Sequence, residues 1–246
     1  TNDRVAVNDL TAAVMDGQFS GTAVFGMNSR TQSRISGTFS DLDVARLLAL
    51  PTGRVTPIDG QTTGSVDLTF MGTQFSTASG VVDATVTANA GTGDSAAIPV
   101  NGRIKLTGTN GLFNVDTADL RSDNSRLNAT GRFDFKSDDS DLAIEIRSSK
   151  ASEIDRMMRV LGVSPEFEEQ MDSLQVQFAG NLTFDGKVTG NMSDVTIAGP
   201  LAVGRVTMRG RELGRVTTDI MVAPAGVELR NGRLTESSGG TAAFTV

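Results

Sequence analysis

The chain has 246 residues, a net charge of −7 and no histidine, cysteine, tryptophan or tyrosine. Without histidine and cysteine it lacks the usual general base, thiol chemistry, disulfides and nearly every zinc site, so we expect no enzyme, metal or cofactor. The acidic balance argues against binding to nucleic acid and against electrostatic docking on anionic membranes. No apolar run approaches the roughly 18 residues of a membrane span. Because the sequence opens on Thr1 without a signal peptide, we expect a segment of a longer protein.

Alternation of apolar and polar residues at a period of two dominates the chain and predicts strands. One apolar and one solvated face per strand is typical of antiparallel sheet, so we predict a mainly β fold. Short clusters of Gly, Asn, Asp and Thr predict turns between these strands at 91–94, 108–111 and 231–232. The clearest alternating runs are 66–70, 82–88, 127–135, 142–146, 174–178 and 227–230.

Three stretches, 41–50, 152–162 and 164–174, have the apolar spacing of short amphipathic helices. We expect Asp41 to cap the first helix, and Ser152 and Asp155 to form a capping box at the second. The third helix is expected to begin at Ser164–Pro165. Each must lie on the sheet or close one of its openings. Their apolar residues are Val44, Leu47, Leu48, Ile154, Met157, Met158, Leu161, Phe167, Met171 and Leu174.

The chain also repeats itself. Residues 43–48 (DVARLL) match 153–158 (EIDRMM), and 68–72 (LTFMG) match 182–186 (LTFDG) in the same order. Alternating strands resemble one another by chance, but the shared helix followed by the shared strand rises above that background. We therefore expect residues 1–40 to be the tail of a preceding repeat, followed by one helix-plus-strands repeat at 41–150 and another at 151–246. Together they would form one continuous β segment.

Candidate sites for chemistry are few. Asp138, Asp139 and Asp141 crowd one turn, but the Gly and the distal Glu of a calcium loop are missing, which favours a solvated hairpin tip. Four arginines at 205–215 offer contacts to a phosphate-bearing partner. In an acidic chain such charges are more typical of a solvated strand edge that resists edge-to-edge pairing.

The apolar face of the sheet has two possible fates. The sheet closes into a β-sandwich or barrel, or it curls into an open trough whose wall accepts acyl chains. Composition and periodicity leave both alternatives open. The residues predicted to line such a groove are Val66, Leu68, Phe70, Val82, Val86, Ile104, Leu106, Leu142, Ile144, Ile146, Val176, Phe178, Leu182, Phe184, Val227 and Leu229.

A family resemblance favours the open form. The repeated helix motif, the strand 182–190 (LTFDGKVTG), 199–201 (GPL) and 232–234 (GRL) before two glycines together resemble the repeated β region of AsmA-like proteins. Within that family they resemble in particular the TamB (translocation and assembly module) type. It implies an elongated, curled antiparallel sheet, or β-taco, whose hydrophobic groove crosses the periplasm from an inner-membrane anchor. We expect that anchor, and any membrane contact made through it, to lie outside this segment.

The resemblance also implies a function. Members of this family are associated with phospholipid movement to the outer membrane and with assembly or secretion of outer-membrane proteins. We therefore expect a periplasmic lipid conduit whose partners are phospholipids or other acyl-chain lipids, with no catalytic residues. One alternative is a scaffold for outer-membrane protein assembly that pairs with client strands. A further alternative is a structural cell-surface module with a closed β-sandwich core.

Overall fold

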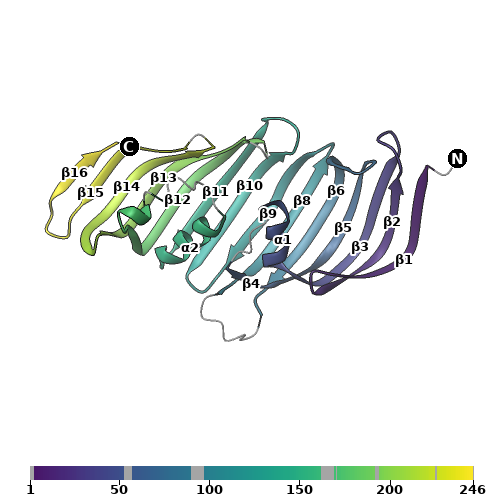
Figure 1. Cartoon of the computed structure of the whole chain (residues 1–246), viewed down its shortest axis with the longest axis horizontal. Coiled ribbons are helices and arrows are strands. Elements are labelled where there is room, and N and C mark those ends of the chain that lie inside the picture. Colours follow the sequence, from purple (N-terminus) through teal and green to yellow (C-terminus); the bar gives the residue numbers. More distant parts are fainter. Residues whose placement is uncertain are drawn as a thin grey trace.

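The structure, a computed structural model, describes residues 3–52, 57–89, 97–161, 169, 171–191, 194–224 and 226–245. Fourteen of the strands it describes form one sheet, in which every neighbouring pair is antiparallel. They follow one another in chain order along an elongated molecule (Figure 1). The sheet is open because β1 and β16 are its two ends. The predicted mainly β, open and curled sheet is confirmed, and the alternative of a closed β-sandwich is wrong.

The strands of this sheet are β1 (Arg4–Val14), β2 (Gly17–Gly26), β3 (Gln32–Asp43), β5 (Gln61–Met71), β6 (Gln74–Thr87), β8 (Asn101–Thr109), β9 (Leu112–Arg121), β10 (Ser125–Asp134), β11 (Ser140–Ser148), β12 (Gln177–Asn191), β13 (Asp194–Met208), β14 (Arg211–Ala223), β15 (Gly226–Thr235) and β16 (Thr241–Phe244). Two short strands, β4 (Ile58–Asp59) and β7 (Ile98–Pro99), pair in parallel as a separate ribbon.

Two of the three predicted turns can be compared with the structure. Asn110 and Gly111 connect β8 to β9 with φ of 50° and 91°, the positive values of a tight hairpin turn. Asn231 and Gly232 instead lie inside β15, where Asn231 has a φ of 53° and the pairing with β14 shifts register. The turn predicted there is wrong, because β14 pairs with β15 on both sides of this bulge. Residues 91–94 lie outside the described residues.

The helices are α1 (Val44–Thr52) and α2 (Ala151–Leu161), close to the predicted ranges. The predicted caps are wrong. Asp43 caps α1 by accepting a hydrogen bond from the Arg46 backbone N–H at 2.8 Å, whereas Asp41 lies in β3. Ser152 lies within the first turn of α2. Residues 171–173 are helical, and the predicted start of that helix at 164–165 lies outside the described residues.

Both helices lie on the same side of the sheet (Figure 1). In chain order, α1 follows β3 and precedes β5, and α2 follows β11 and precedes β12. The repeat and its boundaries remain a prediction. Three clusters of buried apolar residues lie on the side that the helices cover. One is centred under α2, one joins α1 to the β4–β7 ribbon, and one lies among the phenylalanines of β5 and β9.

Candidate functional site

The register of the sheet aligns apolar side chains across neighbouring strands. Directly opposite residues of paired strands share a face. One such row begins at Val66 in β5, which pairs with Val82 in β6, and Val82 pairs with Leu106 in β8. The row continues without a polar residue through Val115, Gly131, Leu142, Val188, Ile197, Val222 and Val227. We call the face that carries this row the apolar face.

The predicted groove residues fall on this face or pack into the clusters on it. They are Val66, Leu68 and Phe70 in β5, Val82 and Val86 in β6, Ile104 and Leu106 in β8, Leu142, Ile144 and Ile146 in β11, Val176 just before β12, Phe178, Leu182 and Phe184 in β12, and Val227 and Leu229 in β15. Only Phe70, Val86, Leu182 and Phe184 are buried, and the others keep part of their surface accessible.

Helix α2 covers one part of the apolar face. Ala151 and Ile154, with exposed fractions of 0% and 5%, pack against Leu182 and Phe184 of β12. Val86 is covered in a similar way, in the cluster that includes Val44 at the start of α1 and the residues of β7. These parts of the predicted groove are therefore closed core, and the accessible part lies elsewhere on the face.

Aromatic rings extend the apolar face at the strand ends that lie away from α1 and α2. The Phe75 ring lies over Phe70 with a centroid separation of 4.5 Å, and the Phe135 ring meets Phe113 edge-on at 5.6 Å. Phe75 and Phe135 are 59% and 40% exposed. This end of the apolar face is thus built from large apolar groups that solvent reaches.

Sequence reasoning missed several residues of this face. Val203, Ile220 and Val222 are buried in the cluster under α2, and Phe113 is buried beside Phe70. The signal in β14 is weak, because Thr218 stands on the buried face and Met221 on the opposite one, which interrupts the period-two alternation of residues 216–222.

The opposite face carries charged residues in cross-strand ion pairs. The Arg103 guanidinium donates to Asp83 from Nε at 3.1 Å and from Nη2 at 2.8 Å, and these bonds lower the pKa of the Asp83 carboxyl. Arg34 makes the same two-bonded contact to Asp67, at 3.0 and 2.8 Å. More than half of each arginine side chain is exposed, so such pairs add little to stability. We call this the polar face.

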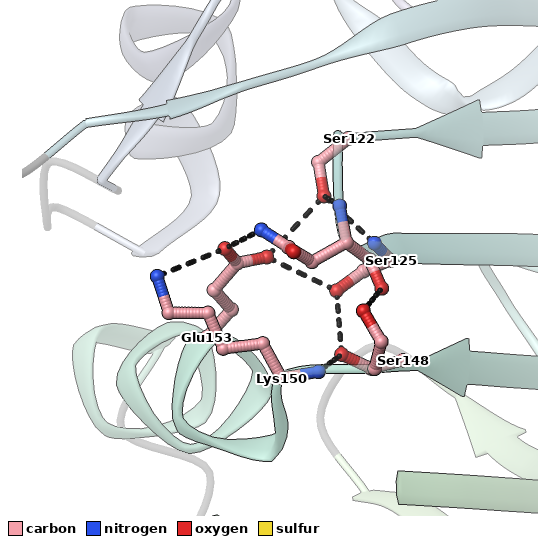
Figure 2. A network of polar contacts seen from close by, with 7 residues as sticks. Ser122, Ser125, Ser148, Lys150 and Glu153 are labelled. Carbon is pink, nitrogen blue, oxygen red and sulfur yellow. Dashed lines mark hydrogen bonds and ion pairs between the residues drawn. The ribbon is translucent and has the colours of Figure 1, made fainter. Parts of the chain in front are cut away.

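A buried carboxylate fixes α2 to the turn between β9 and β10 (Figure 2). Glu153 is 8% exposed, and the Asn124 amide donates to its Oε1 at 2.6 Å. The hydroxyls of Ser122 and Ser125 donate to Oε2 at 3.3 and 3.2 Å, and Lys150 Nζ lies 3.6 Å from Oε1. A buried charge is tolerated only with such partners. No pattern in the sequence predicts this network, since its members are brought together by the pairing of β10 with β11.

A shallow cavity of about 440 Å³, largely open to solvent, lies beside this network at the strand ends of β9 to β12. Its walls include Arg121, Arg126 and Arg147 of the polar face, hydroxyl and amide side chains of the connecting turns, and Leu182. The cavity therefore lies where the polar face meets one end of the apolar face.

The acidic turn between β10 and β11 is held by an ordinary ion pair and hydrogen bonds. Asp141 pairs with Lys187 at 3.1 Å, and Asp139 accepts a hydrogen bond from Ser137 at 2.9 Å. Across the described residues, no group of three or more acidic side chains is arranged to hold a metal ion. Of the predicted arginine cluster, Arg205 and Arg209 lie in or next to β13, and Arg211 and Arg215 lie in β14.

Comparison with known proteins adds no relative: no protein-family model, curated protein or solved structure matches the chain. No helix in the part of the chain that the structure describes is long and apolar enough to cross a membrane.

Proposed function

We propose that this chain is part of a periplasmic lipid conduit, in which acyl chains of phospholipids lie along the apolar face. The observation that supports this most directly is the unbroken apolar row from β5 to β15. Side chains without hydrogen-bond donors offer acyl chains an environment like that of a bilayer interior. Such side chains do not fix an acyl chain at one position, so the chain can slide along the row. The path is passive, and any energy is supplied elsewhere.

The accessible stretch of the row runs through Val66, Val82, Leu106 and Leu142. Each of these side chains is only partly exposed, as expected for a surface that a flexible chain would cover. The family resemblance is a second support for the proposal. The periplasmic location and the inner-membrane anchor rest on this resemblance alone. The open sheet fits the same proposal, since a closed sandwich would leave no path for a lipid.

The test is lipid binding by a variant of the apolar face. The chain is produced in bacteria with two membranes, and copurifying lipid is identified by mass spectrometry, followed by titration with a fluorescent fatty acid. Leu142→Asp places a charge in the accessible row and should abolish probe uptake. Its neighbour Ala143 lies on the polar face, opposite Thr130 and Lys187, so Ala143→Asp is the matched control and should bind like the parent.

Circular dichroism must show the strands of both variants intact, and Leu142→Ser replaces Leu142→Asp if the charged variant does not fold. Phe184 is unsuitable for this test, because it is buried under α2 and an aspartate there would disrupt the core. Absence of copurified lipid together with no probe uptake by the parent chain would refute the proposal.

One observation favours the scaffold alternative. Among the described strands, β1 pairs on one side only, and its Val5 and Val7 are 49% and 36% exposed. A client strand can add to such an edge by main-chain hydrogen bonds. Crosslinking from a photoreactive residue at position 6 to unfolded barrel precursors, combined with no lipid binding, would favour the scaffold over the conduit.

A further inference from the structure

Three arginines stand directly opposite one another on the polar face. Arg121 of β9 pairs in register with Arg126 of β10, and Arg126 pairs with Arg147 of β11. Neighbouring strands are about 4.8 Å apart, so the backbones of the three arginines fall within roughly 10 Å of one another. Like charges directly opposite each other destabilise a sheet. The structure balances this repulsion with carboxylate partners in the next row of the sheet.

The described carboxylates that pair with these arginines all lie on one side of the arginine row. Asp119 accepts bonds from Arg121 Nε at 3.0 Å and Nη2 at 2.6 Å, and from Arg126 Nη2 at 3.2 Å. Arg147 Nη2 lies 2.6 Å from Asp185 and 3.3 Å from Glu145. Asp119, Glu145 and Asp185 belong to the next cross-strand row, in which Asn128 stands between Asp119 and Glu145. This row lies farther from the strand ends than the arginine row.

The other side of the arginine row faces the cavity of about 440 Å³. The side chains of Arg121, Arg126 and Arg147 remain accessible, since they are 57%, 51% and 41% exposed despite their carboxylate partners. Further donors in the lining include the Ser149 hydroxyl and the Asn181 amide.

We propose that this cavity binds a phosphate group, either as a soluble phosphate or as the headgroup of a phospholipid. The planar guanidinium offers a fork of N–H donors that matches two phosphate oxygens, and neighbouring hydroxyl and amide groups supply donors for the others. Among the described residues that line the cavity, Asp123 is the one carboxylate, and it opposes the bound anion. The site lies apart from the accessible apolar row and does not depend on the proposed conduit function.

The experiment titrates the whole chain with inorganic phosphate by calorimetry, and separately measures its binding to vesicles of phosphatidylglycerol. Binding of soluble phosphate without vesicle binding identifies a soluble ligand. Vesicle binding that glycerol phosphate competes away identifies a lipid headgroup. If the chain binds neither probe, the proposal is wrong.

Variants tie the binding to the arginine row. Arg126→Gln removes the central guanidinium and should weaken phosphate binding about tenfold or more. Arg34→Gln is the matched control, because Arg34 is likewise paired with a carboxylate, Asp67, on the same face but is not among the residues that line the cavity. Its affinity should equal that of the parent, whereas Asp123→Asn should bind phosphate more tightly.

The outcomes separate this proposal from non-specific attraction. Equal weakening by Arg34→Gln and Arg126→Gln would overturn it, and so would unchanged binding by Arg126→Gln. Because Arg126 is a surface residue, loss of folding is not expected, and circular dichroism checks it. If Arg126→Gln nevertheless unfolds, Arg121→Gln tests the same row. Loss of phosphate binding leaves acyl-probe uptake on the apolar face intact, so the two proposals fail independently.

Discussion

Single glycines allow neighbouring strands to approach closely on the apolar face. Gly80 in β6 has a φ of +138°, and a Cβ atom placed on it would lie 1.9 Å from the Asp67 carbonyl oxygen of β5. We therefore predict that Gly80→Ala destabilises the fold by about 2–4 kcal/mol, since the clash adds to the backbone strain. Urea unfolding followed by circular dichroism measures the change in the free energy of unfolding.

Gly226 provides the control for this prediction. Its φ of +139° is nearly the same, but a Cβ atom there would meet nothing within 4 Å. Gly226→Ala should therefore cost only the backbone strain, about 1 kcal/mol. If both variants lose equal stability, close approach of β5 to β6 is not the reason for glycine at position 80.

At the scale of elements, α2 is held by a narrow set of contacts. Ile154 is 5% exposed and packs against the cluster beneath the helix, whereas Met158, on the same helix, is 37% exposed. Ile154→Ala should lower the free energy of unfolding by about 2–4 kcal/mol, because it leaves a cavity between helix and sheet. Met158→Ala should change it by no more than about 0.5 kcal/mol. Thermal unfolding of the two variants measures both changes. Similar losses of stability in Ile154→Ala and Met158→Ala would contradict the prediction.

Elements were more predictable from sequence than their ends or their pairing. Alternation indicated the strands, and apolar spacing indicated α1 and α2 to within a few residues, because each period follows from local geometry. The caps failed since Asp41 is held in β3 with a φ of 58°, a conformation that depends on its place in the sheet. Asn231 and Gly232 have the composition of a turn, but the neighbouring strand pairs on both sides of them.

The candidate sites also differ in whether local periodicity or strand pairing determines them. The face on which the predicted groove residues lie follows from period-two alternation, which assigns a side chain to a face without any knowledge of its neighbours, whereas their role in a groove stays a prediction. How much of that face the helices cover was not predictable, since it depends on where α2 docks. The row of Arg121, Arg126 and Arg147 is set by the register of three strands, and a shift of one residue would separate them.

At the scale of the whole molecule, the linear order of the sheet makes stability local. Each strand of the large sheet pairs only with its neighbours, and the cluster under α2 shares no residue with the phenylalanine cluster of β5 and β9. In such quasi-one-dimensional folds, the free energy of unfolding is close to a sum of the stability of each unit and of its contacts with adjacent units. Distant parts of the sheet should therefore open separately rather than in one cooperative step.

Hydrogen exchange can test this local stability. Val203 in β13 is 1% exposed at the centre of the cluster under α2, so Val203→Ala should cost about 2 kcal/mol through the cavity it leaves. We expect the amides of β12–β14 and α2 to lose protection, while those of β3, β5 and β6 keep theirs. Phe70→Leu, in the other cluster, is the reciprocal variant and should weaken β5, β6 and β9 but leave β13–β15 protected. Equal loss of protection along the whole sheet in either variant would show instead that the fourteen strands unfold as one unit, because damage at one cluster would then reach strands that make no contact with it.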